Sequence, residues 1–114
     1  MKTLYTVYFT GGETVDHEVD LPQEPGYGAL RDIILPHLSG GEHEAELEHV
    51  SVLWNNEALD MFVDDLGALL HLPVNPKATE IYRNNWLTQH PDTDPESLSA
   101  IYGVAILFHR KVWY

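Results

Sequence analysis

The chain has 114 residues with 18 acidic and 6 basic side chains, which gives a formal net charge of −12; a single domain is expected at this length. It contains no cysteine, so disulfides, zinc–thiolate sites and thiol catalysis are excluded. No apolar run is long enough to cross a membrane, and the first residues alternate like a strand rather than like a signal peptide. We therefore expect a soluble, cytoplasmic protein that makes no membrane contact.

The negative charge lies entirely in the first part of the chain. Residues 1–66 hold 14 acidic and 2 basic side chains, a net charge of −12, whereas residues 67–114 hold 4 of each and are neutral overall. A strongly negative surface repels nucleic acid and anionic membranes, so direct nucleic-acid binding is not expected. The charge favours a protein partner with a basic surface, although it would also serve solubility alone.

The first third of the sequence predicts two strands and a helix. Residues 4–9 are rich in β-branched and aromatic side chains, which predicts a strand, and the paired glycines within residues 10–13 supply a tight turn. In residues 14–21 apolar and acidic side chains alternate, which predicts a half-buried strand with an acidic outer face. The apolar residues of 27–35 keep helical spacing, and Pro36 is expected to end that helix.

The middle of the chain predicts a second hairpin. Residues 42–54 begin with alternating glutamates and continue with valine and tryptophan at the same parity, so one strand passes from a charged end into the core. Residues 59–64 predict its partner strand. The apolar residues 68–72 predict a further short strand.

The last third predicts a helix and a buried strand. Asn75 caps the helix and Pro76 occupies its first position, where a missing N–H costs nothing. The helix is expected to stop near Gln89, because His90 precedes a proline. Residues 101–108 are almost continuously apolar, which suits a central strand that is buried on both faces.

The element order is therefore β-β-α-β-β-(β)-α-β, which predicts an α+β fold. We expect a two-layer domain in which a mostly antiparallel sheet of five or six strands carries two helices on one side. No internal repeat is present.

The acidic strand within residues 14–21 is the main functional candidate. Carboxylates two residues apart on a strand are separated by about 6.8 Å, and duplex DNA carries one negative charge per about 3.4 Å of helix axis on each strand, so such a row can present a comparable regularity. The predicted partner-binding residues are Asp16, Glu18, Asp20, Glu44, Glu46 and Glu48. The alternative interpretation is a solvated strand face that prevents edge-to-edge aggregation.

The spacing of the histidines and acidic residues does not favour a metal site. His43 and His49 differ in parity from the neighbouring glutamates, so a strand places the two residue types on opposite faces, and a structural site would need a further ligand such as His17. Residues 92–96 begin like a calcium loop but lack its glycine and its terminal glutamate. We expect neither a metal ion nor a cofactor.

Catalysis also lacks a recognisable motif. Asp60, Asp64 and Asp65 are the carboxylates that could serve acid–base chemistry, although the pair Asp64–Asp65 precedes a turn and is expected to be exposed. No motif of a hydrolase, metalloprotease or nucleotide-binding protein occurs, so we assign no catalytic residue. The aromatic C-terminus, Trp113 and Tyr114, fits a core contact, or an apolar contact for a partner or for a second copy of the chain.

Residues 60–69 (DMFVDDLGAL), 72–79 (LPVNPKAT) and 103–107 (GVAIL) resemble a family of small uncharacterised bacterial, phage and plasmid proteins, known as a domain of unknown function. The shared pattern is a strand that ends in an acidic turn with glycine, a Leu-Pro-x-Asn segment, a helix and a late apolar strand. The resemblance covers most of the chain loosely, and the chain departs from it in a longer insert over residues 84–99. It implies a bacterial or mobile-element origin and supplies no catalytic residues.

These observations lead to a ranked expectation. The first hypothesis is a non-catalytic binding protein, in its sharpest form an acidic inhibitor or DNA mimic that engages a basic, nucleic-acid-handling partner. The second is an enzyme or metal-binding accessory protein that uses the glutamate–histidine cluster of residues 43–49. The third is a housekeeping domain without a ligand. The oligomeric state does not follow from the sequence.

Overall fold

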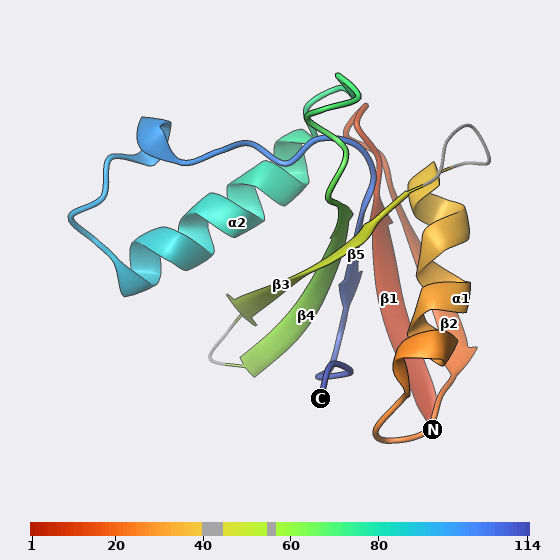
Figure 1. Ribbon diagram of the computed structural model, residues 1–114. Coiled ribbons are helices and arrows are strands. Elements are labelled where there is room, and N and C mark those ends of the chain that lie inside the picture. Colours follow the sequence, from red (N-terminus) through yellow and green to blue (C-terminus); the bar gives the residue numbers. More distant parts are fainter. Residues whose placement is uncertain (40–44, 55–56) are drawn as a thin grey trace.

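The computed structural model of the chain describes residues 1–39, 45–54 and 57–114, and these form one five-stranded antiparallel sheet with two α-helices (Figure 1). The strand order is β2-β1-β5-β4-β3, so the hairpins β1–β2 and β3–β4 flank β5. The expected α+β class is confirmed. The elements are β1 (Lys2–Tyr8), β2 (Thr14–Asp20), α1 (Tyr27–Ser39), β3 (Leu47–Trp54), β4 (Glu57–Asp64), α2 (Pro76–Gln89), the 3-10 helix η1 (Pro95–Ser97) and β5 (Ala105–Phe108).

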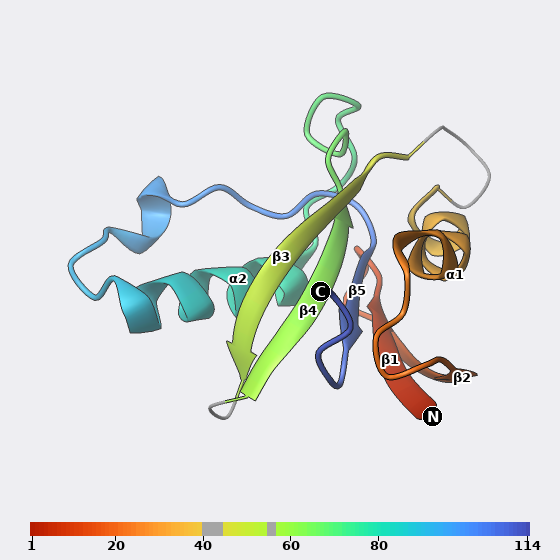
Figure 2. The same cartoon turned by 60° about the horizontal axis from the view of Figure 1, so that its bottom comes forward.

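The two helices lie on opposite faces of the sheet, whereas the sequence led us to expect both on one side (Figures 1 and 2). Neighbouring residues of β4 separate the two cores, since Phe62 packs under α1 while Met61 and Val63 pack under α2. The interior strands β4 and β5 have consecutive buried residues that point to both sides of the sheet, so each face needs a cover. In the described part of the chain neither helix is long and apolar enough to span a membrane.

Helix α1 runs through Pro36 to Ser39, beyond the end expected from the sequence. Proline removes one hydrogen bond within the helix and usually bends or ends it. Tertiary contacts hold the last turn here, because Leu38 is buried in the core and Nε2 of His37 lies 3.1 Å from the Tyr5 hydroxyl.

Residues 65–71 form consecutive turns, so the short strand that composition predicted for residues 68–72 is absent. The amide of Leu70 donates to the carbonyl of Leu66, and that of Leu72 donates to the carbonyl of Gly67. Local hydrogen bonds therefore use the backbone groups that a strand would pair. Leu69 is 74% exposed, so the apolar composition of the segment does not reflect burial.

Strand β5 is shorter than the predicted residues 101–108, because the chain turns at Gly103, where φ is +82°. Before this glycine, Tyr102 makes an isolated bridge with Val74. A Cβ added to Gly67 would lie 2.6 Å from the carbonyl oxygen of Tyr102, so the crossing of these two segments requires glycine there.

Asn75 is completely buried at the start of α2, and its side chain joins three parts of the chain. Its Oδ1 accepts from the backbone N–H of Ala78, which caps the helix as predicted. Its Nδ2 donates to the carbonyl oxygens of Tyr8 at 2.8 Å and Gly103 at 3.0 Å. The side chain thus fixes the start of α2 against the end of β1 and the segment that enters β5.

Asp60 on β4 is a second buried polar anchor, with 2% of its surface exposed. Its Oδ1 lies 2.6 Å from Nε2 of His49, and its Oδ2 accepts the backbone N–H groups of Val112 and Trp113. The His49 ring also stacks on Trp113, with 4.9 Å between ring centroids. These contacts hold the C-terminal segment against the face of the sheet that carries α1.

Three titratable rings meet beneath α1. The ring of His17 stacks on Tyr5 at 5.1 Å and lies 5.1 Å from that of His37. Burial, and secondarily the nearby His17, lower the pKa of His37, because a charged imidazole is disfavoured where water is scarce and a second cation is close.

Replacing Asn75 with alanine is expected to lower the free energy of unfolding by about 2–4 kcal/mol, since it removes a helix cap and the Nδ2 donor that the carbonyls of Tyr8 and Gly103 share. Urea denaturation measures this change. The matched control is Asn84→Ala on the exposed side of the same helix, which we expect to change stability by less than about 0.5 kcal/mol. Equal effects of the two substitutions would contradict the role given to Asn75.

The lowered pKa of His37 predicts a loss of stability in mild acid. Between its folded-state pKa and its usual value near 6.5 the unfolded chain binds the additional proton, so stability falls as the pH drops through this window. We expect His37→Gln to flatten the stability profile as the pH falls below about 7. The control is His71→Asn, because His71 is exposed and asparagine tolerates its φ of 55°; a profile unchanged by His37→Gln argues against this cause.

Candidate functional site

The predicted acidic row lies on β2, an edge strand of the sheet (Figure 2). Asp16, Glu18 and Asp20 are exposed on the face that carries α2, whereas His17 and Val19 point under α1 and are partly buried. The alternation expected from the sequence is therefore present in this strand. Helix α2 packs mainly against β3, so it leaves the acidic row uncovered.

Neighbouring groups hold two of these carboxylates. Oδ1 of Asp16 accepts from the Thr6 hydroxyl at 2.6 Å, and Oγ1 of Thr6 lies 2.7 Å from Nε2 of His109. Because Thr6 donates its only proton to Asp16, the imidazole is the donor in the second contact. Oδ1 of Asp20 accepts from the Met1 ammonium at 2.9 Å.

Beside this row the uncovered sheet face forms a shallow hollow of about 440 Å³. Its floor is apolar, with Leu59 and Leu107 buried, and its rim carries the charged residues Asp16 and Glu57. The complete lining comprises Thr6, Tyr8, Thr14, Asp16, Glu57, Leu59, Leu107 and His109. The acidic side chains thus border an accessible surface of the sheet.

The second set of predicted acidic residues lies at the opposite edge of the sheet. Glu46 directly precedes β3, and Glu48 lies at the second position of that strand. Three strands lie between β3 and β2, and Glu44 lies outside the described residues. The two acidic rows are therefore not neighbours. Strand β3 begins at Leu47 in the described part of the chain, later than predicted.

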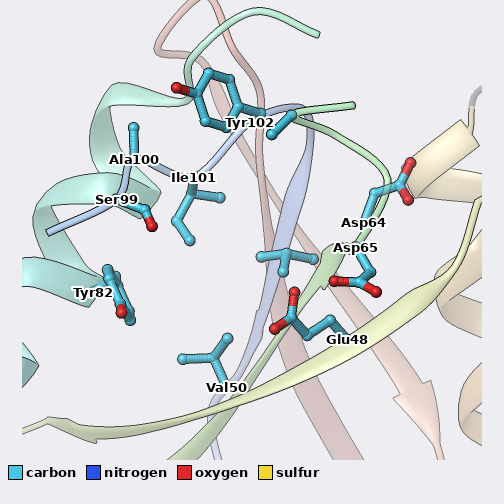
Figure 3. Close-up of a pocket in the computed structure, with 11 residues that line it drawn as sticks. Glu48, Val50, Asp64, Asp65, Tyr82, Ser99, Ala100, Ile101 and Tyr102 are labelled. Carbon is cyan, nitrogen blue, oxygen red and sulfur yellow. The ribbon is translucent and has the colours of Figure 1, made fainter. Parts of the chain in front are cut away.

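Glu48 and Asp65 face each other at the wall of a cleft of about 220 Å³ between β3, α2 and the segment before β5 (Figure 3). Across the cleft lie Tyr82 and Ser99, with Tyr102 near its upper end in the view. The remaining lining residues are Val50, Val63, Asp64, Ala68, Ala100 and Ile101. Sequence reasoning missed the pairing of Glu48 with Asp65, because no local pattern sets which side chains meet across a strand and the turn after its partner.

Burial raises the pKa of Glu48, and a hydrogen bond to Asp65 together with the negative charge of Asp65 raises it further. Two carboxyl groups that share a proton are a common arrangement for acid–base chemistry. The cleft brings the two carboxyl groups of Glu48 and Asp65 together with the aromatic ring of Tyr82. Within the described residues, however, no group of three histidine or acidic side chains is arranged to hold a metal ion.

The other candidate carboxylates have structural roles. Asp60 holds the C-terminal segment, and Asp64, which we expected to be exposed, is only 5% exposed. Its Oδ1 accepts from the backbone N–H groups of Glu46 and Leu66, so it fixes the turn that follows β4. Tertiary contacts bury it, because the chain before β3 folds back over this turn.

The glutamate–histidine cluster is divided between the two faces of the sheet. His49 packs on Phe62 and Trp113 under α1, whereas Glu48 lines the cleft beside α2. The opposite-face placement predicted from parity is confirmed for these two residues, and His43 lies outside the described residues. In the loop 92–96, the Asp94 carboxylate accepts from the backbone N–H of Glu96 and so caps η1.

The aromatic C-terminal segment is divided between core and surface. Val112 is completely buried and Trp113 packs on His49, whereas Tyr114 is 62% exposed. The segment therefore acts mainly as a core contact in this structure.

Comparison with protein-family models, with curated proteins and with solved structures found no match. The family resemblance of residues 60–79 therefore stays an expectation.

The raised pKa of Glu48 predicts that Glu48→Gln becomes stabilising as the pH rises. The folded chain holds the Glu48 proton more tightly than the unfolded chain, so stability is lost as the pH rises through the folded-state pKa. Glutamine mimics the protonated form, and the variant should match the parent in acid and exceed its stability at neutral pH. The control is Glu80→Gln, at an exposed position of α2. Identical pH profiles of stability for the parent and for Glu48→Gln would contradict the raised pKa of Glu48.

Proposed function

We propose that the protein is a non-catalytic binding protein whose acidic β2 face engages a basic surface of a partner protein. The observation that carries the proposal is the exposed row Asp16, Glu18 and Asp20, which lies on the face of the edge strand β2 opposite to α1, where no helix of the described chain covers it. Charge complementarity of this kind steers association and selects partners by sign. The net charge of −12 adds a field that favours basic partners over acidic ones.

The structure supports a local contact better than imitation of a long duplex. The row on β2 holds three carboxylates, and Glu46 and Glu48 stand at the far edge of the sheet instead of extending it. A strand-length acidic row fits one basic segment of a partner. Proteins that handle nucleic acid present such segments to phosphates, so we propose this class of partner, in keeping with an inhibitor that occupies its basic site.

A charge-matched pair of variants tests the proposal. The first variant carries Asp16→Asn, Glu18→Gln and Asp20→Asn, and the second carries Glu80→Gln, Asp92→Asn and Glu96→Gln, so both lose the same charge from exposed positions. The probe is a fluorescent deca-lysine peptide followed by anisotropy. If each exposed pair contributes about 0.5 kcal/mol, the first variant should bind roughly tenfold more weakly than the parent.

The second variant should change the affinity far less, and added salt should weaken the parent and narrow the difference between the variants. Equal losses in both variants would show that only net charge matters and would overturn a site on β2. Absence of any binding by the parent protein at low salt would remove the proposal altogether.

A further inference from the structure

The hydrogen-bond register of β2 directs the backbone of its acidic residues outward. At one end of the ladder Met1 and Leu21 exchange two hydrogen bonds, and at the other end Phe9 donates to Glu13. Such pairs alternate along an antiparallel ladder, so the odd-numbered residues of β2 bond to β1. The backbone N–H and C=O groups of Asp16 and Glu18 therefore point away from the sheet.

At the opposite edge of the sheet a side chain already bonds to the outer backbone groups of the strand. There Asn85 of α2 reaches the outer backbone of β3, where its Oδ1 accepts from the N–H of Leu53 at 2.7 Å and its Nδ2 donates to the carbonyl of Ser51 at 3.1 Å. A side-chain amide thus occupies the groups that an added strand would use. Among the described residues no hydrogen bond comparable to these reaches the outer backbone of β2.

We infer that the basic partner adds an extended segment to β2 as a sixth, antiparallel strand, with basic side chains at alternate positions opposite Asp16 and Glu18. This inference rests on the proposed function and specifies the form of the partner. Strand addition of this kind gains affinity from main-chain hydrogen bonds and specificity from alternate side chains. The open edge and the acidic row coincide on the same residues, so one segment can satisfy both.

The side chains of β2 define the sequence that fits. Residues directly opposite one another in neighbouring strands have Cβ atoms about 4.5–5.5 Å apart, so lysine or arginine opposite Asp16 and Glu18 would meet a carboxylate. The intervening partner residues would lie beside Val15 and His17, of which Val15 is 45% exposed. The expected motif therefore alternates basic and apolar residues.

A second copy of the chain is a poor occupant of this edge. Antiparallel pairing of β2 with its own copy through the same outward backbone groups would place the two acidic rows side by side on one face, and directly opposed like charges destabilise a sheet. A basic strand relieves this repulsion, which is why we commit to a basic partner.

The test uses three synthetic peptides that share the side-chain sequence Thr-Lys-Val-Lys-Val-Lys-Thr. One is unmodified, one is N-methylated at the lysines, and one is N-methylated at the valines. In an added antiparallel strand the lysine amides point toward β2 and the valine amides point away. We expect lysine methylation to weaken binding roughly tenfold or more, since two or three hydrogen bonds of about 0.5–1.5 kcal/mol are lost, and valine methylation to have little effect.

Hydrogen exchange of the full chain provides an independent readout. The backbone amides of Asp16 and Glu18 should exchange fast in the free protein and become protected with the unmodified peptide, whereas the amide of His17 should be protected in both states. Equal binding of all three peptides without new protection would overturn strand addition and leave charge recognition standing. Failure of every peptide to bind would overturn both proposals.

Discussion

The buried amide of Asn75 joins parts of the chain that are distant in sequence. It satisfies the first turn of α2 and the carbonyls of Tyr8 and Gly103 with one side chain. An unpaired polar group in this position would cost far more than a hydrogen bond contributes, so the three segments must stay together. Because α2 starts at this point, Asn75 also sets where the helix crosses β3, and hence where Asn85 reaches the outer edge of that strand.

This arrangement makes the two edges of one sheet unlike. The β3 edge lies under α2, and the cleft beside it holds Glu48 and Asp65, where burial and the neighbouring Asp65 raise the pKa of Glu48. The β2 edge keeps its outer backbone groups and its acidic row exposed. Charged residues on an edge strand commonly prevent aggregation, and the same features allow a strand of opposite charge to be accepted. The negative charge of the row explains both the protection against aggregation and the acceptance of a basic strand.

Four residues of the segment 60–79 have clear structural roles. Asp60 holds the backbone of the C-terminal segment, Asp64 fixes the turn after β4, and Gly67 allows a close approach to Tyr102. The fourth residue is Asn75, which caps α2 and donates to the carbonyls of Tyr8 and Gly103. The segment 60–79 therefore stabilises the fold. The proposed binding face lies on β2, at the far end of the sheet.

The sequence alone determined the elements whose signals are local: the alternation in β2, the Asn75–Pro76 start of α2, and the opposite faces of Glu48 and His49, because side-chain periodicity and capping depend on neighbouring residues. Only the tertiary structure decided the rest. It placed the helices on opposite faces, carried α1 through Pro36, buried Asp64, and separated the acidic rows by three strands. Strand order and register arise from contacts between distant residues, which no local pattern of the chain encodes.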